Sequence, residues 1–188
     1  MLKSVQLSVL ILFILMAGCS GISKYDDKET AAVVKDQEIT VGDLRFLYPD
    51  DTALDYLDWA IEVELVKQEV KEMGLDISNN LPDEKTFAEF EALPPENTKE
   101  ANEKQIREYA EAQAKKLDMT PEEFHREYVK RLFEQSAYIN TYLQEKLDDA
   151  EADINDVNWI DEHVEEYDDL MKKLMDEIED EIDVLIDY

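Results

Sequence analysis

His125 and His163 are the side chains of this chain whose chemistry is best suited to catalysis or metal binding. Glu122 and His125 have the spacing of a Glu-x-x-His motif, and di-iron helix bundles need two copies of that motif. Ile160 stands where His163 would need its glutamate, so the second copy is incomplete. A nucleophile triad needs a serine or cysteine presented beside a histidine, and the sequence has no Gly-x-Ser-x-Gly turn. We therefore expect both histidines to be solvated residues of helices.

The acidic stretch that begins at Asp149 offers carboxylates at alternate positions, as a calcium-binding EF-hand loop does. It lacks the glycine of the sixth loop position, and Ile160 occupies the twelfth, where the bidentate glutamate belongs. The sequence also has no glycine-rich phosphate loop. It therefore predicts no metal site, no cofactor and no enzymatic activity, and its acidic faces are expected to be solvent surface.

Cys19 is the only cysteine of the chain, so its thiol cannot form an internal disulfide. It follows the positively charged Lys3 and a mostly apolar stretch over residues 5–17. A membrane-spanning helix needs about 20 apolar residues, so this stretch is short for a span but fits the hydrophobic region of a secretory signal. The position of Cys19 favours a role as an attachment point rather than as part of the core.

The residues Leu15-Met16-Ala17-Gly18-Cys19 resemble a bacterial lipobox, in which small residues precede an invariant cysteine. Met16 occupies the place where leucine is usual, and Leu15 lies one place earlier. The resemblance implies cleavage between Gly18 and Cys19 and thioether lipidation of Cys19. Two or more acyl chains would then hold the protein stably on a membrane. The alternative is an uncleaved signal anchor in which the thiol of Cys19 stays unmodified.

The composition is that of an acidic, helix-rich and folded chain. The 188 residues include 48 acidic and 19 basic side chains, which give a formal charge of −29. Only four glycines and five prolines interrupt the chain, and 44% of its residues are hydrophobic, which argues against disorder. A negative field of this strength repels nucleic-acid phosphates and anionic lipids, so we expect no nucleic-acid partner.

We expect the chain to divide into a signal peptide over residues 1–18, a lipidated cysteine and polar tether over 19–30, and a folded module over 31–188. The module opens with two short β-prone runs around residues 35–37, followed by a capping box at Thr40 and Asp43. A long helix is expected over 52–73 with Gly74 behind it. Because this helix is apolar on two faces, we expect neighbours on both sides.

The second half reads as three amphipathic helices and a short one. The short helix is expected over 83–92 and the next over 98–117, with Ile106 facing inward. A capping box at Thr120 and Glu123 begins a helix to residue 147, with Leu132 on its inner arc. After an acidic connector over 148–156, a last helix carries a narrow apolar stripe. The end of the chain fits either a continued helix or a strand.

Two stretches resemble the SurA-like chaperone module. The first is "AAVVKDQEITVGDLRFL", continuing through "ALDYLDWAIEVELVKQEVKEMGLDIS", and the second is "AKKLDMTPEEFHREYVKRLFEQSAYINTYLQEKL". The resemblance implies a mainly α, elongated multi-helix module with a short N-terminal β-hairpin, which a C-terminal strand can join. That would pair "IDVLI" with "AAVV". The turn at residues 35–37 departs from the Asn-Gly that is frequent in the family.

Together with the lipobox, this module is similar to the PrsA-type foldase lipoproteins of Gram-positive bacteria. The resemblance implies a protein anchored by lipid to the outer face of the cell membrane. Those foldases usually carry a parvulin prolyl isomerase domain before the closing segment, and here only the connector over 148–156 occupies that place. We therefore expect no isomerase activity.

Four aromatic residues that lie apart from the main apolar stripes of the expected helices are the candidate client-binding residues: Tyr56, Trp59, Phe133 and Tyr138. They either pack on neighbouring helices or line an apolar groove for unfolded polypeptides. The expected function is that of a chaperone-like protein that holds unfolded secreted or membrane proteins. The alternative is a scaffold or accessory lipoprotein that binds one partner through its C-terminal amphipathic helix.

Overall fold

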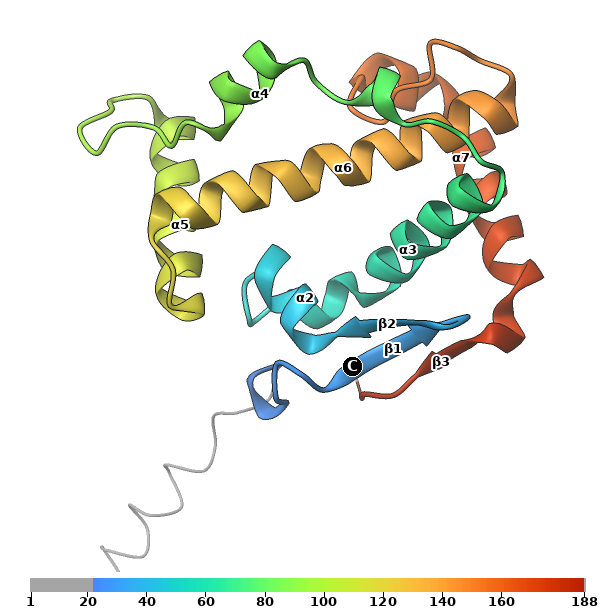
Figure 1. Ribbon diagram of the computed structural model, residues 1–188, viewed down its shortest axis with the longest axis horizontal. Coiled ribbons are helices and arrows are strands. Elements are labelled where there is room, and N and C mark those ends of the chain that lie inside the picture. Colours follow the sequence, from blue (N-terminus) through green and yellow to red (C-terminus); the bar gives the residue numbers. More distant parts are fainter. Residues whose placement is uncertain (1–21, 188) are drawn as a thin grey trace, which may run out of the picture.

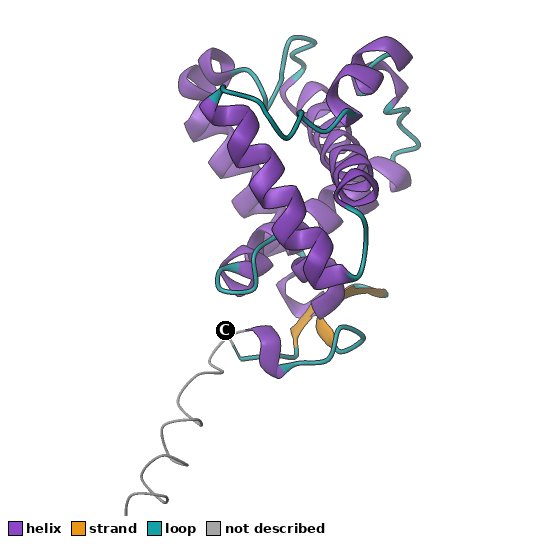
Figure 2. Cartoon of the chain, turned by 90° about the vertical axis from the view of Figure 1, so that its left-hand side faces the viewer, coloured by secondary structure: helices purple, strands orange, loops and turns teal. Residues whose placement is uncertain are grey.

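The computed structural model describes residues 22–187, so the predicted signal peptide and the proposed modification site at Gly18 and Cys19 lie outside the described residues. The fold is mainly helical with a small antiparallel sheet, as expected (Figure 1). The strands gather at one end of the molecule and the helices extend from them (Figure 2). None of the helices within residues 22–187 is both long enough and apolar enough to cross a membrane.

The strands are β1 (Thr30–Val34), β2 (Gln37–Thr40) and β3 (Ile182–Val184). The α-helices are α2 (Val41–Leu47), α3 (Leu57–Glu72), α4 (Glu84–Glu91), α5 (Ala101–Leu117), α6 (Pro121–Leu147) and α7 (Val157–Glu177). Short 3-10 turns are η1 (Ile22–Lys24), η2 (Ala53–Tyr56), η3 (Ser78–Asn80) and η4 (Glu179–Glu181).

Local signals set the ends of several helices. Thr40 caps α2 by accepting a hydrogen bond from the amide of Asp43 at 3.1 Å, and the Asp43 carboxylate accepts one from the amide of Thr40. An equivalent capping box begins α6. Gly74 follows α3 with a φ of +66°. This left-handed conformation is unfavourable for a residue that carries a Cβ atom, and glycine adopts it freely. These predicted signals are confirmed.

The sheet has the order β2-β1-β3, and both pairings are antiparallel. A two-residue turn joins β1 to β2, and Lys35 adopts a φ of +52° in it. β3 pairs with β1 in a register that places Val184 opposite Ala32 and Ile182 opposite Val34. The expected pairing of the two ends of the module is therefore confirmed, and the end of the chain is a strand rather than a continued helix.

The main core lies between the sheet, α3, the C-terminal part of α6 and α7. Helix α3 is its centre, since Leu57, Ile61, Leu65 and Val66 are almost completely buried. A second, smaller core joins α5 to the N-terminal part of α6 around Phe124. The two apolar faces of α3 explain this position, because both are covered by other elements.

Residues 22–30 are packed against the fold, which corrects the expected tether. Ile22 is fully buried in the main core. The hydroxyl of Tyr25 receives a hydrogen bond from the amide of Asp187 at 3.0 Å, and the carbonyl of Asp27 accepts one from the amide of Gly42 at 2.8 Å. The polar composition of the segment hid this packing, because one isoleucine supplies most of its apolar contact with the core.

Three other expectations about burial were wrong. Ile106 is 41% exposed, because α5 crosses the N-terminal end of α6 and only its later turns are covered (Figure 1). Leu132 is exposed midway along α6, between the two cores. His125 is buried rather than solvated, because α4 lies against α6 and the Phe90 carbonyl is 3.0 Å from His125 Nε2.

Candidate binding cleft

A cleft of about 390 Å³ opens between the edge strand β2 and the helices α2, α3 and α6. Figure 1 shows the arrangement of these elements, with α6 above α2 and α3 and the hairpin below them. Apolar side chains from three of the elements line it: Ile39, Leu44, Leu47, Ala60 and Val63. The volume lies near the lower end of the range of about 300–1,000 Å³ for ligand pockets, so it suits a short segment rather than a folded domain.

The apolar lining of the cleft follows from the amphipathic elements around it. Ile39 alternates with the exposed Glu38 on β2, which directs the isoleucine toward the helices. Val63 belongs to the second apolar stripe of α3, and both stripes of this helix contribute buried residues to the main core. Leu44 and Leu47 lie one turn apart on α2. We call these residues, together with Ala60, the cleft floor.

The cationic residues of the cleft are largely neutralised within the chain. Arg131 pairs with Asp43 at 3.5 Å, and its guanidinium lies 4.1 Å from the centre of the Phe46 ring. Lys67 pairs with Glu64 at 3.3 Å. These contacts hold the long side chains against the walls of the cleft. Four of the five residues of the cleft floor are buried, and Ala60 is the one that stays partly exposed.

A polar joint between α2 and α5 fixes the α2 wall of the cleft. The buried Gln113 donates hydrogen bonds to the carbonyl groups at the end of α2, including that of Tyr48 at 3.1 Å. Lys116 donates to the same carbonyl at 3.0 Å and pairs with Asp50 at 3.0 Å. Burial lowers the pKa of Lys116, while Asp50 opposes that change. Sequence periodicity missed this joint, because buried glutamine has no apolar signature.

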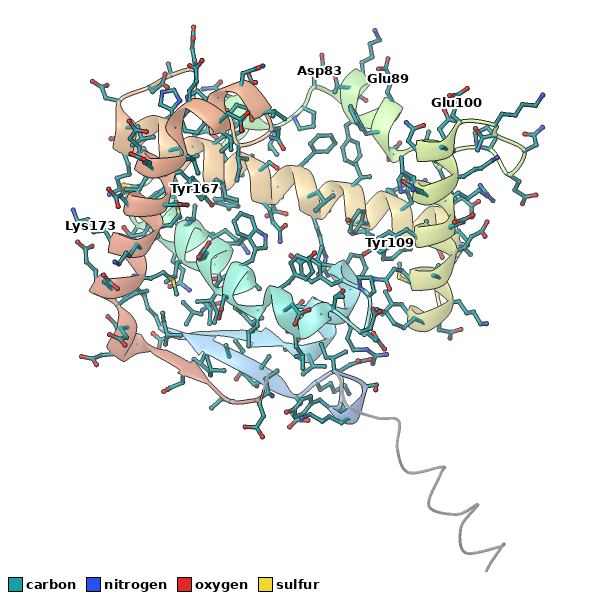
Figure 3. The ribbon with its side chains drawn as sticks, turned by 180° about the vertical axis from the view of Figure 1, so that it is seen from behind. Asp83, Glu89, Glu100, Tyr109, Tyr167 and Lys173 are labelled. Carbon is teal, nitrogen blue, oxygen red and sulfur yellow. The ribbon has the colours of Figure 1, made fainter. Side chains whose placement is uncertain are left out.

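Tyrosine rings complete the same joint. Tyr109 points inward from α5 (Figure 3), and its ring centre lies 5.4 Å from that of Tyr128 on α6. Burial raises the pKa of Tyr48 to about 12, with smaller contributions from Tyr128 and Tyr56. The phenols therefore stay neutral at physiological pH, and the rings act as apolar packing with a polar tip.

The four predicted client-binding residues lie outside the lining of this cleft. Tyr56 is 43% exposed and stacks on Tyr48, with ring centres 4.1 Å apart. Trp59 and Tyr138 are partly buried against the main core. Phe133 packs edge-on against Phe90 of α4, with ring centres 5.4 Å apart.

The four aromatic residues thus occupy different settings instead of one patch. Tyr56 is the one whose side chain offers the most free surface, and Phe133 serves to hold α4 on α6. The cleft itself carries smaller aliphatic residues and an edge strand. The signals that could have indicated it are the second apolar stripe of α3 and the short, polar second strand of the hairpin.

An acidic contact between α3 and α7 makes a pH-dependent contribution to stability. Tyr167 points from α7 toward α3 (Figure 3). The pKa of Glu62 is raised, mainly by burial and further by the nearby Asp58 and Asp168. Because the fold favours the protonated form of Glu62, this group weakens folding increasingly as the pH rises through its raised pKa. At neutral pH its charge therefore opposes folding.

Replacing Glu62 by glutamine is expected to raise the thermal midpoint of unfolding at pH 7. The gain should shrink as the pH falls through the raised pKa of Glu62 and should vanish below about 4.3, the ordinary glutamate pKa. The Glu62 carboxyl is then protonated in both the folded and the unfolded chain. Glu165→Gln, at an exposed position of α7, is the matched control for the loss of one negative charge. Equal gains for both variants over the whole pH range would contradict a specific role for Glu62.

The remaining chemistry-bearing residues do not assemble into a metal centre in the described part of the chain. Across residues 22–187 there is no group of three or more histidine, cysteine or acidic side chains placed to hold a metal ion. His163 stacks on Trp159, and its Nδ1 lies 2.8 Å from the carbonyl oxygen of that residue. Asp149 accepts a hydrogen bond from the Trp159 indole at 2.8 Å. These side chains fasten the connector to α7.

Comparisons of the chain with protein-family models, with curated proteins and with solved structures found no match. The resemblance to the SurA-like module accordingly depends on the sequence stretches that carry it.

Proposed function

We propose that this protein is a lipid-anchored, chaperone-like protein of the outer face of the cell membrane, which holds unfolded segments of secreted or membrane proteins without ATP or prolyl isomerase activity. The observation that carries the proposal is the open cleft with an apolar floor between β2, α2, α3 and α6. A client side chain would be buried there reversibly. The many exposed carboxylates would keep the complex soluble.

The short connector between α6 and α7 supports the absence of an isomerase domain from this part of the module. Helix α6 ends at Leu147 and α7 begins at Val157. Between them, the Asp153 carboxylate accepts a hydrogen bond from the Asn140 side chain at 2.8 Å. The connector therefore folds back on α6 and leaves no room for an inserted globular domain.

The structure favours the holding function over the scaffold alternative. The apolar stripe of the C-terminal helix includes Met171 and Leu174, and both are buried in the main core of the same chain. Ile178, just after the helix, is buried in the same core. This part of the stripe is thus used within the chain while α7 is docked, and a partner would have to displace it.

An aggregation assay tests the proposed function. The full chain in lipid nanodiscs should slow the aggregation of several unrelated denatured proteins at near-stoichiometric ratios, and empty nanodiscs should not. Ala60→Asp places a charge on the cleft floor, and Ala112→Asp makes the same change at an exposed position of α5. We expect the first to reduce the protection several-fold and the second to preserve it.

Circular dichroism establishes that both aspartate variants remain folded. The proposal fails if the native chain protects no client or a single client, since a general holding protein should act on unrelated sequences. It also fails if the folded Ala60→Asp variant protects clients as well as Ala112→Asp does.

The proposed anchor makes a separate prediction about Cys19. Cys19→Ser should abolish lipid attachment and leave the signal uncleaved, because the thiol is the acyl acceptor that precedes cleavage in a lipobox. Intact-mass measurement of the membrane-extracted protein checks this. An added lipid mass on the serine variant, equal to that of the native chain, would contradict lipidation of Cys19.

If Cys19 is the anchor, the packing of Ile22 limits the distance between the fold and the membrane. Ile22 is fully buried beside the sheet, and three peptide units span at most about 11 Å. The end of the molecule that carries the strands would then lie nearest the bilayer (Figure 2).

A further inference from the structure

The strand β2 has backbone hydrogen-bonding groups directed to an open sheet edge. Just after β1, the amide of Lys35 donates to the carbonyl of Glu181 at 2.8 Å. Because alternate residues of an antiparallel strand bond to the same neighbour, the backbone N–H and C=O groups of the odd-numbered residues of β1 point toward β3. Val33 therefore faces β3, and Glu38, which lies opposite Val33 on β2, is a non-hydrogen-bonded partner. The N–H and C=O of Glu38 consequently point away from β1, and β2 is the last strand on that side.

This open edge forms part of the cleft. Gln37, Glu38 and Ile39 all line it, and the cleft floor continues from Ile39 to Val63 of α3. An added strand would lie beside Glu38, and every second side chain of that strand would face the floor. The opposite edge of the sheet is formed by β3, which carries the exposed Val184 and is followed by the exposed Leu185, and it does not border this cleft.

The charges around the cleft favour a cationic segment. Glu38 and Glu134 line it, and neither forms an ion pair within residues 22–187. Lys71 is the cation of the lining that pairs with no carboxylate in the described chain, and its ammonium lies 5.8 Å from the centre of the Tyr138 ring. The formal charge of −29 attracts basic segments over a longer range and repels acidic ones.

We infer that the cleft binds an extended polypeptide segment in which apolar and cationic residues alternate, and that this segment adds as a strand to the edge of β2. Its backbone bonds with the N–H and C=O of Glu38. Its apolar side chains rest on the cleft floor, and its cationic side chains, which point to the other face of the sheet, approach Glu38. The inference rests on the proposed holding function and specifies the class of segment that the cleft takes.

Two short peptides test the inference, one with valine alternating with lysine and one with valine alternating with glutamate. The full chain is studied in nanodiscs of zwitterionic lipid, so that the bilayer does not select for charge. We expect the lysine peptide to bind at least about tenfold more tightly at low salt, and the difference to narrow as salt screens the field. Equal affinities at low salt would overturn the charge preference.

Amide hydrogen exchange on the native chain locates the peptide without any substitution. Strand addition should slow the exchange of the Glu38 amide, because that N–H gains a carbonyl partner. The outward amide of Val184 on the opposite edge should be unchanged. Protection of Val184 in place of Glu38, or of neither residue, would overturn the assignment to β2.

A pair of proline variants separates the backbone contact from the charge. Proline removes an N–H and is tolerated at edge positions whose N–H faces solvent. Glu38→Pro should weaken the lysine peptide by at least about tenfold beyond the effect of Glu38→Ala, which keeps the N–H. Val184→Pro is the matched proline on the other edge and should leave the affinity unchanged.

The outcomes distinguish this inference from the proposed function. If the native chain suppresses aggregation and Glu38→Pro does so equally well while also binding the lysine peptide normally, strand addition is wrong and the holding function stands. If the native chain suppresses no aggregation but binds the peptide at β2, the holding function is wrong and the cleft is a peptide site of another kind.

Discussion

Replacing Phe124 by alanine is expected to cost about 3–5 kcal/mol of unfolding free energy, the range for truncating a buried aromatic residue. Phe124 is fully buried at the centre of the smaller core. Its ring centre lies 5.2 Å from that of Phe46 on α2 and 5.9 Å from that of Tyr109 on α5. One side chain therefore joins three helices, and its loss leaves a cavity where they meet.

The effect of Phe124→Ala should be concentrated in α5. The smaller core is separate from the main core, which contains none of its buried residues. We expect the amides of α5 to lose protection from hydrogen exchange by a factor of at least about a hundred, while those of α3 keep theirs. Denaturant titration measures the free energy, and exchange measured residue by residue locates the change.

Phe90→Ala is the matched control for Phe124→Ala. Phe90 lies on α4, beside the start of α6, and its side chain is 56% exposed. Phe90→Ala should cost clearly less than Phe124→Ala, because more than half of the Phe90 side chain stays exposed to water in the fold. If Phe124→Ala destabilised α3 and α5 equally, the two cores would form a single cooperative unit, contrary to this interpretation.

Ending the chain after Glu177 is expected to lower stability by at least about 4 kcal/mol and the thermal midpoint by about 8–16 °C. The shortening removes Ile178 and Ile186, two buried members of the main core. It also removes β3, so that the amide of Lys35 loses its bond to the carbonyl of Glu181. β1 then becomes a second open edge of the sheet.

The shortened chain should also self-associate, because removal of the acidic residues 179–181 leaves an apolar strand edge without charges that repel another copy. Thermal unfolding and light scattering measure the two effects. Leu185→Ala, at a residue that is 59% exposed, is the control and should have little effect on either. A shortened chain as stable as the native one would show that β3 is not part of the cooperative fold.

Local signals in the sequence were sufficient for most elements of this protein. The capping boxes at Thr40 and Thr120 and the glycine after α3 were read correctly, because each depends on residues three or four positions apart. The alternation in the last residues also allowed the strand that pairs with β1. These features are decided within one or two turns of chain, and no distant contact overrides them.

The sequence alone did not determine which polar residues would be buried. Gln113 and His125 are both buried, and each contacts a backbone carbonyl at least 35 positions away. Ile22 likewise joins the core from a polar segment. Such contacts depend on how α4 and α5 cross other elements, and the pattern of one helix carries no information about what lies across it.

The cleft also belongs to the tertiary structure. Its lining comes from four elements, β2, α2, α3 and α6, and Ile39 and Arg131 are brought to it from distant parts of the chain. The sequence alone determined that α3 would be apolar on two faces and that the chain would carry a large negative charge. Only the arrangement of α6 over α3 decided that a cleft would remain beside Ala60 and Val63, because a helix pattern specifies an apolar face but not the shape of the surface that covers it.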